Sequence, residues 1–279
     1  MSTYVIGSSG FIGSALLAKM KAASLPVFSV GRTNADIHLD LETGNTDLFE
    51  HVQAGDTVVF LAAVSAPDVC KNRREYAENI NVKVTSELID KLTGKNVRVI
   101  FSSTDIVFGK ALAQVTDNTS LQPFGEYGEM KAQVEARFVN NENVKVIRFS
   151  YVMGPNDKYT TMLSECAEKQ ESVSVFDGFE RNVVALSDVT EGIIRLVEGW
   201  QNFAEKQINF SGPECVARWE LTKAYAEKFS PELKLSLVEA PAGFWDARPK
   251  RIAMNSDLFS TLLGREAKSI EQNLRMWCN

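Results

Sequence analysis

Short apolar runs rich in β-branched residues alternate with longer amphipathic stretches through the first half of this 279-residue chain. The runs have the length and composition of buried strands, and they span residues 4–6, 27–30, 37–39, 57–61, 97–102 and 144–149. The stretches between them that have a helical pattern include residues 11–23, 74–93 and 127–139. Strands that are apolar on both faces and alternate with helices predict a parallel sheet covered on both sides. We therefore expect an α/β fold with a Rossmann-type, doubly wound parallel sheet.

A glycine-rich segment, GSSGFIG, directly follows the first expected strand and opens the first expected helix. Gly7 would allow a tight turn, Gly10 would let the backbone approach a pyrophosphate, and Gly13 would let the helix pack closely on the sheet. Free N–H groups and the positive end of the helix dipole would then bind phosphate. The alternative is a Gly/Ser turn that only precedes a helix, but the position after a strand favours a dinucleotide site.

The end of the second expected strand bears on the choice of coenzyme. An acidic residue there would hold the ribose hydroxyls of NAD and repel a 2′-phosphate. The strand ends instead in Gly31-Arg32-Thr33, and the planar cationic fork of Arg32 suits a phosphate. A solvated loop arginine is the alternative interpretation. We predict that NADP(H) is preferred and that NAD(H) can be used.

The segment YGEMK places Tyr127 and Lys131 four residues apart. On a helix these positions share a face, so the phenol and the ammonium can point into one site. A free phenol has a pKa of ~10, and a nearby cation would lower it, so that Tyr127 could act as an acid or base. Lys131 could also hold the nicotinamide ribose. Because Tyr-x-x-x-Lys is common by chance, an ordinary surface helix is the alternative.

Small and hydroxyl-bearing residues follow two of the expected strands, at the edge where ligands of open α/β sheets bind. The strand 97–102 runs into Ser103, Thr104 and Asp105, and a hydroxyl there could hydrogen-bond a substrate carbonyl. The strand 57–61 ends at Leu61-Ala62-Ala63, whose small side chains would let a flat coenzyme lie against the backbone. A turn residue and ordinary packing are the alternatives for these two segments.

The second half of the chain has a different rhythm after Gly154. We expect strands near 173–176 and 235–239, helices near 189–198 and 218–229, and a surface loop over 241–250. These elements predict a smaller C-terminal lobe that binds substrate. In domain terms, residues 1–155, with 181–210 returning to them, would bind NADP(H), and residues 156–180 and 211–279 would mainly form the substrate-binding lobe.

Taken in order, the segments GSSGFIG, LAA, SSTDIVFG, YGEMK and RFSYVMGP resemble those of the extended short-chain dehydrogenase/reductases, the NAD-dependent epimerase/dehydratase superfamily. Within that superfamily the chain is most similar to the dTDP-4-dehydrorhamnose reductase group. The resemblance covers roughly the first 155 residues and continues more faintly through Arg181, Asp188 and residues 247–249. It implies a catalytic triad of Thr104, Tyr127 and Lys131, with Asp105 beside it.

The resemblance also assigns binding residues. Adenine would contact Asp40 and Leu41, and Asn81 would be a structural asparagine on a helix. The full set of implied coenzyme contacts is Gly7, Ser9, Gly10, Phe11, Ile12, Gly13, Arg32, Asp40, Leu41, Leu61, Ala62, Ala63, Ser102, Tyr127 and Lys131. The implied substrate contacts are Ser65, Val107, Tyr151, Arg181 and Arg248, where Arg181 would clasp a diphosphate unless it is an exposed structural arginine.

The activity implied by the resemblance is hydride transfer from NADPH to C4 of a 4-keto-6-deoxy sugar attached to a nucleoside diphosphate. Tyr127 would give the proton, Lys131 would tune it and Thr104 would orient the carbonyl. Dehydration is disfavoured because Ile106 stands where family dehydratases carry a second carboxylate. Two alternatives stay open: an epimerase with tightly bound NAD, since residues 176–183 are closer to the epimerase pattern, and a coenzyme-binding regulatory subunit without catalysis.

Composition limits the partners that we expect. A net charge of −6 without a dense basic cluster argues against nucleic-acid binding, and the absence of a leader or long apolar run predicts a cytoplasmic protein without a membrane anchor. Four scattered cysteines (Cys70, Cys166, Cys215 and Cys278) predict reduced thiols. With only His38 and His51 present, we expect no metal site. A small nucleotide sugar is the expected partner, and a homodimer is a family expectation.

Overall fold

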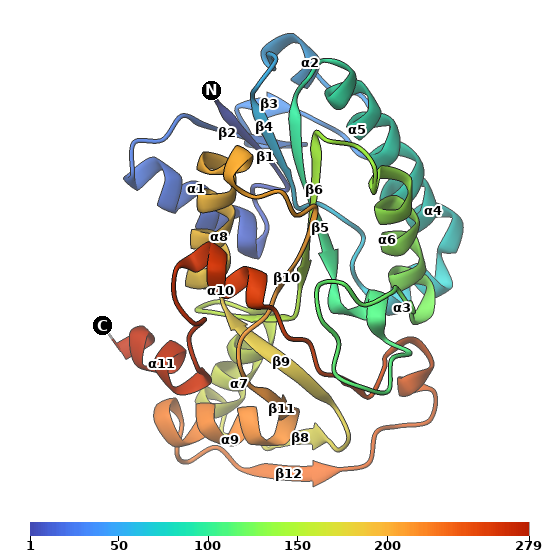
Figure 1. The fold of residues 1–279 in the computed structure, drawn as a ribbon. Coiled ribbons are helices and arrows are strands. Elements are labelled where there is room, and N and C mark those ends of the chain that lie inside the picture. The colour runs from blue at the N-terminus through green and yellow to red at the C-terminus, as the bar shows by residue number, and fades with distance from the viewer. Residues whose placement is uncertain (279) are drawn as a thin grey trace.

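The computed structural model describes residues 1–278 and contains one large parallel sheet and two smaller sheets (Figure 1). The large sheet has seven strands in the order β10-β6-β5-β4-β1-β2-β3. Their bounds are β1 Thr3–Ile6, β2 Val27–Gly31, β3 Ile37–His38, β4 Thr57–Phe60, β5 Arg98–Thr104, β6 Val144–Phe149 and β10 Gln207–Phe210. All of these strands pair in parallel. The expected doubly wound α/β fold is confirmed.

Helices cover both faces of this sheet, which is why its strands are apolar on both sides. On one face lie α2 Leu48–His51, α5 Thr85–Gly94 and α6 Gly125–Phe138, which bury side chains such as Leu88 and Phe138 against the strands. On the other face lie α1 Phe11–Ala22, α8 Leu186–Glu198 and α10 Asp257–Leu263, packed around Leu16 and Ile193. Figure 1 shows the two helical layers to the right and left of the strands.

The helix expected over residues 74–93 is interrupted. The structure has α3 Pro67–Asn72 and α4 Arg74–Glu78, then a π-helical segment, η1 Asn79–Val84, and only then α5. The π turn carries Asn81, whose side chain pairs with the backbone of Val64: the Val64 N–H donates to Oδ1 at 2.8 Å and Nδ2 donates to the Val64 carbonyl at 2.9 Å. Asn81 thus has the structural role that the resemblance implied, because its two hydrogen bonds connect this helix to the chain after β4.

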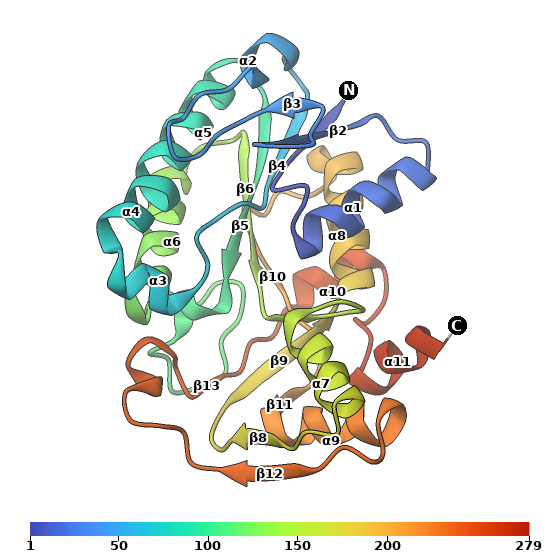
Figure 2. The same ribbon diagram turned by 180° about the vertical axis from the view of Figure 1, so that it is seen from behind.

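The second half builds the smaller sheets around a third apolar cluster (Figure 2). One sheet joins β11 Cys215–Ala217, β9 Glu180–Ala185 and β13 Arg251–Ile252, with β7 Tyr151–Met153 also paired to β9. The other pairs β12 Leu235–Val238 with β8 Val173–Phe176. Beside them lie α7 Lys158–Glu168, α9 Arg218–Phe229 and α11 Ile270–Arg275. The expected strands and helices near 173, 189, 218 and 235 are present, whereas β7, β9, β10, β11 and β13 were not foreseen.

The segment expected to be a surface loop, residues 241–250, is partly buried. It contains a 3-10 turn, η4 Phe244–Ala247, in which Ala247 is buried. Its aromatic side chains pack on the small sheets, with the Phe244 ring 4.8 Å from that of Phe176 and the Trp245 ring 6.0 Å from that of Phe179. These apolar contacts therefore place residues 241–250 against the small sheets. The prolines and glycines of the segment made it look like an exposed loop in the sequence.

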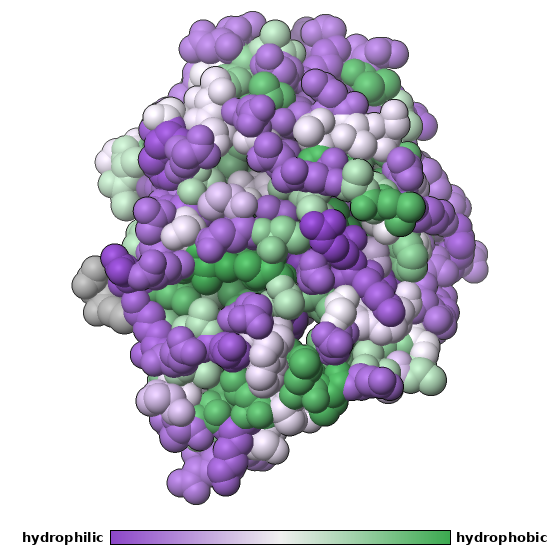
Figure 3. Space-filling view, turned by 60° about the horizontal axis from the view of Figure 1, so that its bottom comes forward, coloured by the Kyte–Doolittle hydropathy of each residue, from purple (hydrophilic) through white to green (hydrophobic). Residues whose placement is uncertain are grey.

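Two further observations concern the surface and the thiols. Seen from the end that carries the small sheets, apolar side chains form patches among polar ones (Figure 3). Within residues 1–278, no helix is both long enough and apolar enough to cross a lipid bilayer. Cys70, Cys166 and Cys215 are free thiols, and the side chain of Cys278 lies outside the described part of the chain.

Candidate functional site

The glycine-rich turn between β1 and α1 is held close to β4. Gly7 has a positive φ of +85°, and a Cβ there would lie 2.8 Å from the backbone nitrogen of Ala62. A Cβ on Gly13 would lie 2.2 Å from the Gly7 carbonyl oxygen, so the helix could not approach the turn with a larger residue. Gly10 precedes α1 without any side-chain cap and the first helical turn contains no acidic residue. The first N–H groups of α1 are therefore available to an anion.

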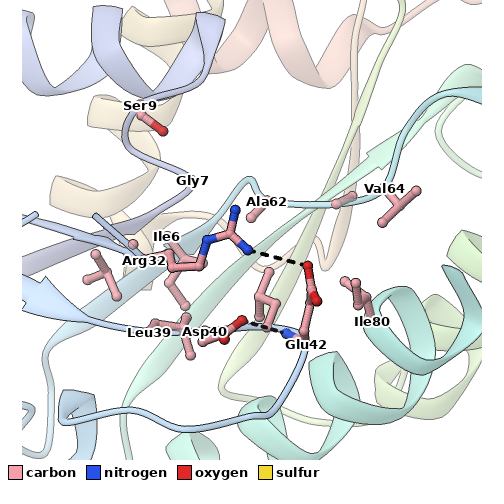
Figure 4. Close-up of a pocket in the computed structure, with 14 residues that line it drawn as sticks. Ile6, Gly7, Ser9, Arg32, Leu39, Asp40, Glu42, Ala62, Val64 and Ile80 are labelled. Atoms are coloured by element: carbon pink, nitrogen blue, oxygen red, sulfur yellow. Dashed lines mark hydrogen bonds and ion pairs between the residues drawn. The ribbon is translucent and has the colours of Figure 1, made fainter. Parts of the chain in front are cut away.

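A pocket of about 240 Å³ opens at the carboxyl edge of β1, β2 and β4 (Figure 4). Seven of the residues that the sequence assigned to coenzyme binding line it: Gly7, Ser9, Arg32, Asp40, Leu41, Ala62 and Ala63. Its walls are completed by Ile6, Val30, Gly31, Leu39, Glu42, Val64 and Ile80, which the sequence did not single out. Of the remaining assigned residues, Gly10 and Phe11 line a second cavity described below. The shape and place of the first pocket suit the adenosine half of a dinucleotide.

Arg32 does not stand alone in this pocket. Its Nη1 lies 3.3 Å from Oε1 of Glu42, and the same oxygen accepts a hydrogen bond from the Tyr76 hydroxyl at 3.1 Å. Asp40 turns its carboxylate toward the Glu42 backbone N–H, at 2.9 Å (Figure 4). The sequence showed no carboxylate at the end of the second strand, but the chain after β3 folds back and supplies one. A 2′-phosphate bound by Arg32 would therefore compete with Glu42.

The predicted catalytic residues come together where β5 ends and α6 begins. Thr104 is the last residue of β5; its hydroxyl donates to Asp105 Oδ1 at 3.2 Å and accepts from the Ile106 N–H at 3.3 Å. Lys131 is buried; its Nζ donates to the Ser102 carbonyl at 2.7 Å and lies 5.9 Å from the centre of the Tyr127 ring. One ammonium thus joins the β5 backbone to the face of α6 that carries the phenol.

The electrostatics of this group differ from the expectation. Burial raises the pKa of the Tyr127 phenol above its usual range, and the charges of Cys70 and Asp105 add to the rise. Burial also lowers the pKa of Lys131 to about 7, although the carboxylate of Glu135 opposes this effect. The prediction that Lys131 lowers the phenol pKa is therefore wrong for this arrangement, because loss of hydration outweighs a cation that is already engaged by a carbonyl oxygen. Tyr127 is a protonated phenol at neutral pH, a state suited to a proton donor.

Asp105 and Arg181 form a buried pair behind the threonine. Arg181 Nε lies 3.4 Å from Asp105 Oδ2, and both side chains are almost inaccessible. The guanidinium also donates to the carbonyls of Glu180, Pro249 and Lys250, at 2.6, 2.6 and 3.1 Å. Burial raises the pKa of Asp105, and the Arg181 cation opposes the rise. Arg181 is thus not an exposed arginine; its donors tie β9 to the segment before β13, and its predicted contact with a substrate diphosphate stays a prediction.

A second cavity of about 830 Å³ separates the glycine turn from the C-terminal half. Ser9, Gly10, Phe11 and Ser14 form one wall, and the opposite wall contains Tyr151, Asp157, Tyr159 and Arg218. Two of the predicted substrate residues, Ser65 and Tyr151, line it. The glycine turn therefore lines both cavities, and Ser9 contributes to each of them.

The other predicted substrate residues do not share this cleft. Val107 is completely buried with Phe108, Val115, Ile252 and Met254, so its side chain has no exposed surface, and its predicted contact with substrate stays a prediction. Arg248 forms a two-pronged ion pair with Asp68, at 2.6 and 3.1 Å, which joins η4 to α3. The apolar cluster buries the Val107 side chain, and Asp68 engages the Arg248 guanidinium. Neither contact can be seen in a single sequence.

Comparison with known proteins places this architecture in a family. Residues 1–277 match the family described as the RmlD substrate binding domain. The chain belongs to this RmlD family. The fold agrees: the superposition on a dTDP-4-dehydrorhamnose reductase from Clostridium acetobutylicum has a TM-score of 0.83 and covers all of both chains, at 16% identity. The superposition on MoeE5, solved in complex with UDP-glucuronic acid and NAD, also has a TM-score of 0.83, over 99% of this chain and 97% of that one, at 21% identity.

The relatives of this RmlD-family protein that are found by sequence include proteins of a different kind, named as subunits of another enzyme. The methionine adenosyltransferase 2 subunit beta of Xenopus tropicalis is 23% identical over 238 residues, which cover 81% of this chain and 71% of the relative. The corresponding protein of Danio rerio is 25% identical over 284 residues, covering 95% and 85%. Membership in the family is therefore compatible with a reductase and with a subunit of another enzyme, two of the three kinds of protein that the sequence left open.

Sequence reasoning missed a buried polar network that supports α6, the helix that carries Tyr127 and Lys131 in this family member. Arg148 on β6 donates from Nε and Nη2 to one oxygen of Glu135, at 2.9 and 2.8 Å, and the Ser103 hydroxyl donates to the other. Glu135 follows Tyr127 and Lys131 at the same four-residue spacing, so all three share one face of α6. That repeated spacing is a signal in the sequence that could have revealed the third residue.

Proposed function

We propose that this RmlD-family protein is an NADP(H)-dependent reductase of a nucleoside-diphosphate 4-keto-6-deoxy sugar. The observation that carries the proposal is the position of Lys131, which joins the Ser102 carbonyl on β5 to the helix face of Tyr127, two residues from Thr104. Thr104, Tyr127 and Lys131 are all present and belong to neighbouring elements, which favours catalysis. Residues 1–155 with 181–210 would bind the coenzyme, and residues 156–180 and 211–279 would mainly bind the sugar nucleotide.

In the proposed reaction the reduced nicotinamide, when bound, supplies a hydride to the carbonyl carbon. The Thr104 hydroxyl would donate a hydrogen bond to the carbonyl oxygen and stabilise the negative charge that develops there. The Tyr127 phenol, which burial keeps protonated, would give its proton to that oxygen, so that the ketone becomes a secondary alcohol. Lys131 would then stabilise the phenolate until it regains a proton from water.

The preference for NADP(H) is part of the same proposal. It is supported by Arg32, whose guanidinium lies in the smaller pocket beside the glycine turn. It is opposed by Glu42, which pairs with that guanidinium at 3.3 Å. We expect the 2′-phosphate to win this competition, because a dianion can accept more of the five guanidinium N–H donors than one carboxylate oxygen does.

The experiment that tests the proposal mixes the purified protein and NADPH with a panel of nucleoside-diphosphate 4-keto sugars and follows the loss of NADPH absorbance. Turnover of at least one substrate is expected. Tyr127→Phe should reduce kcat by about 10²- to 10⁴-fold, the usual contribution of a general acid, with NADPH affinity largely kept. Tyr4→Phe is the matched control and should stay active, because the Tyr4 phenol donates to the backbone carbonyl of His51 and lines neither cavity. A fully active Tyr127→Phe variant would contradict the assignment.

A second candidate function is a coenzyme-binding subunit that acts on a partner enzyme. It is favoured by the relatives that are named as subunit beta of methionine adenosyltransferase 2. Stable complex formation with a methionine adenosyltransferase in size-exclusion chromatography, together with no turnover over the whole substrate panel, would support it. Turnover that depends on Tyr127 would exclude a purely non-catalytic role.

A further inference from the structure

Arg218, the first residue of α9, is held in the larger cavity by aromatic rings. The centres of the Tyr159, Tyr151 and Phe179 rings lie 4.3, 4.5 and 4.9 Å from its guanidinium carbon. Contact between a cation and ring faces fixes the orientation of the planar guanidinium. The arrangement therefore presents a pre-oriented set of hydrogen-bond donors at the wall opposite the glycine turn.

Part of this guanidinium has no partner within the protein. Nη1 of Arg218 is buried and receives no hydrogen-bond acceptor from residues 1–278. A buried donor without an acceptor is unfavourable, and a cation in the first turn of a helix is unfavourable too, because it opposes the helix dipole. Neither feature stabilises the fold, and an anionic ligand in the cavity that Arg218 lines would offset the opposition to the helix dipole.

The neighbouring helix cannot take such an anion itself. The Asp157 carboxylate caps α7 by accepting from the N–H groups of Tyr159 and Thr160, at 2.9 and 3.1 Å. It also accepts from the Tyr151 hydroxyl at 2.8 Å, so its oxygens are already engaged. Among the described residues that line this cavity, Arg218 and the exposed Lys158 are the cations.

We propose that Arg218 binds a phosphoryl group of the substrate's nucleoside diphosphate. This inference rests on the proposed function for the identity of the ligand. Arg218 comes from the C-terminal half and faces the cavity from the side opposite the uncapped start of α1, which can serve the coenzyme pyrophosphate. Arg181, the arginine that the resemblance assigned to this role, is engaged by Asp105 and three backbone carbonyls.

The test is isothermal titration of the NADPH-saturated protein with UDP and, separately, with dTDP. Arg218→Gln should weaken binding of the preferred nucleotide about ten- to a hundredfold, the effect of losing a charge-assisted pair of hydrogen bonds. Arg218→Lys should lose less, since it keeps the charge but not the planar fork. Lys223→Gln is the control: this cation lies on the same helix and pairs with Glu220. It should change the Kd less than twofold, and all variants should keep the NADPH Kd.

Several results would overturn this inference. They are unchanged nucleotide binding in Arg218→Gln, no binding of either nucleotide by the unmodified protein, and weakened NADPH binding in place of nucleotide binding, which would assign the cation to the coenzyme. If Arg218→Gln fails to fold by circular dichroism, phenylglyoxal labelling of the unmodified protein replaces it, and UDP or dTDP must protect the Arg218 peptide in mass spectrometry. Failure of the proposed function is distinguishable: no keto sugar would be reduced while UDP binding still depended on Arg218.

Discussion

At the scale of single residues, the proposed coenzyme pocket contains a cation and an anion that pair with each other, Arg32 and Glu42. Arg32 and Glu42 are both well exposed, so water screens their mutual attraction and the pair itself adds little stability. The pair matters for selectivity instead. Arg32 attracts a 2′-phosphate, whereas Glu42 repels it. Neither side chain affects the binding of the pyrophosphate, which the glycine turn would hold.

Substitutions at these two positions should shift the choice between coenzymes in opposite directions. Arg32→Ala should weaken NADPH binding roughly five- to tenfold through the lost charge-assisted hydrogen bonds, with little effect on NADH. Glu42→Gln should strengthen NADPH binding, because it removes the competing carboxylate. Fluorescence titration of both coenzymes measures this. Equal effects of Arg32→Ala on NADH and NADPH would show that Arg32 does not contact the 2′ position.

Lys131 is the other residue whose charge has a measurable consequence. Its pKa falls from an ordinary value near 10.5 to about 7 in the folded protein. Between these two values the unfolded chain holds a proton that the folded protein has lost. The unfolded state thus binds more protons, so this residue makes the free energy of unfolding rise as the pH increases from 7 toward 10. Below pH 7 its buried charge is a constant cost.

The comparison with Lys131→Met isolates that dependence, since the other titrations cancel in the difference. The free energy of unfolding of the unmodified protein, relative to the variant, should rise by about 3 kcal/mol between pH 6 and pH 9. Urea unfolding at the two pH values gives both quantities. A difference that does not change with pH would mean that Lys131 titrates near its ordinary value and is better solvated than its burial indicates.

At the scale of secondary-structure elements, the position of α6 against β5 and β6 decides whether Thr104, Tyr127 and Lys131, the proposed catalytic group, come together. A methyl group on Gly128 would come within 3.0 Å of the Ile106 carbonyl oxygen, so this helix packs directly against the 3-10 turn after β5, η2 Asp105–Phe108. The buried pair of Glu135 and Arg148 links the same helix to β6. Burial makes this pair sensitive to the loss of one partner.

Breaking the pair from one side should be costly. Arg148→Met leaves the Glu135 carboxylate buried without its cation and should reduce the free energy of unfolding by about 3 kcal/mol or more. The double variant Glu135→Leu with Arg148→Met should recover part of this loss. Arg137→Met on the same helix removes an exposed pair with Asp90 and should cost less than about 1 kcal/mol. Urea unfolding measures all three; a loss in Arg148→Met no larger than in Arg137→Met would contradict the account.

The elements that could be predicted are those whose burial leaves a pattern. The strands of the large sheet up to β6 are covered on both faces and read as apolar runs, and the helix over 218–229 was placed with its observed bounds. β9, Glu180–Ala185, begins with a partly exposed glutamate and then two buried polar residues, Arg181 and Asn182, so its composition hides the strand. The π turn of η1 changes the helical spacing by one residue, which a helical pattern does not resolve.

At the scale of the whole molecule, the larger cavity lies between the glycine turn and the C-terminal half, and the smaller one lies at the carboxyl edge of the large sheet. Residues near the glycine turn were predictable because a short segment dictates their geometry. Glu42 and Arg218 were not, because the fold brings them to the cavities from segments that carry no motif. The sequence thus failed to predict which single charged side chains the fold brings into the two cavities.

The central claim is that a hydride passes from NADPH to a sugar carbonyl carbon in this protein. The most direct test incubates it with NADPH deuterated at C4 of the nicotinamide, once in each stereochemical position, and a nucleoside-diphosphate 4-keto-6-deoxy sugar, followed by NMR of the product. We expect deuterium at sugar C4 from one of the two labelled forms, and none when Tyr127→Phe replaces the unmodified protein for the same reaction time. Sugar that stays unreduced with both forms, or product that carries hydrogen from solvent at C4, would contradict the claim.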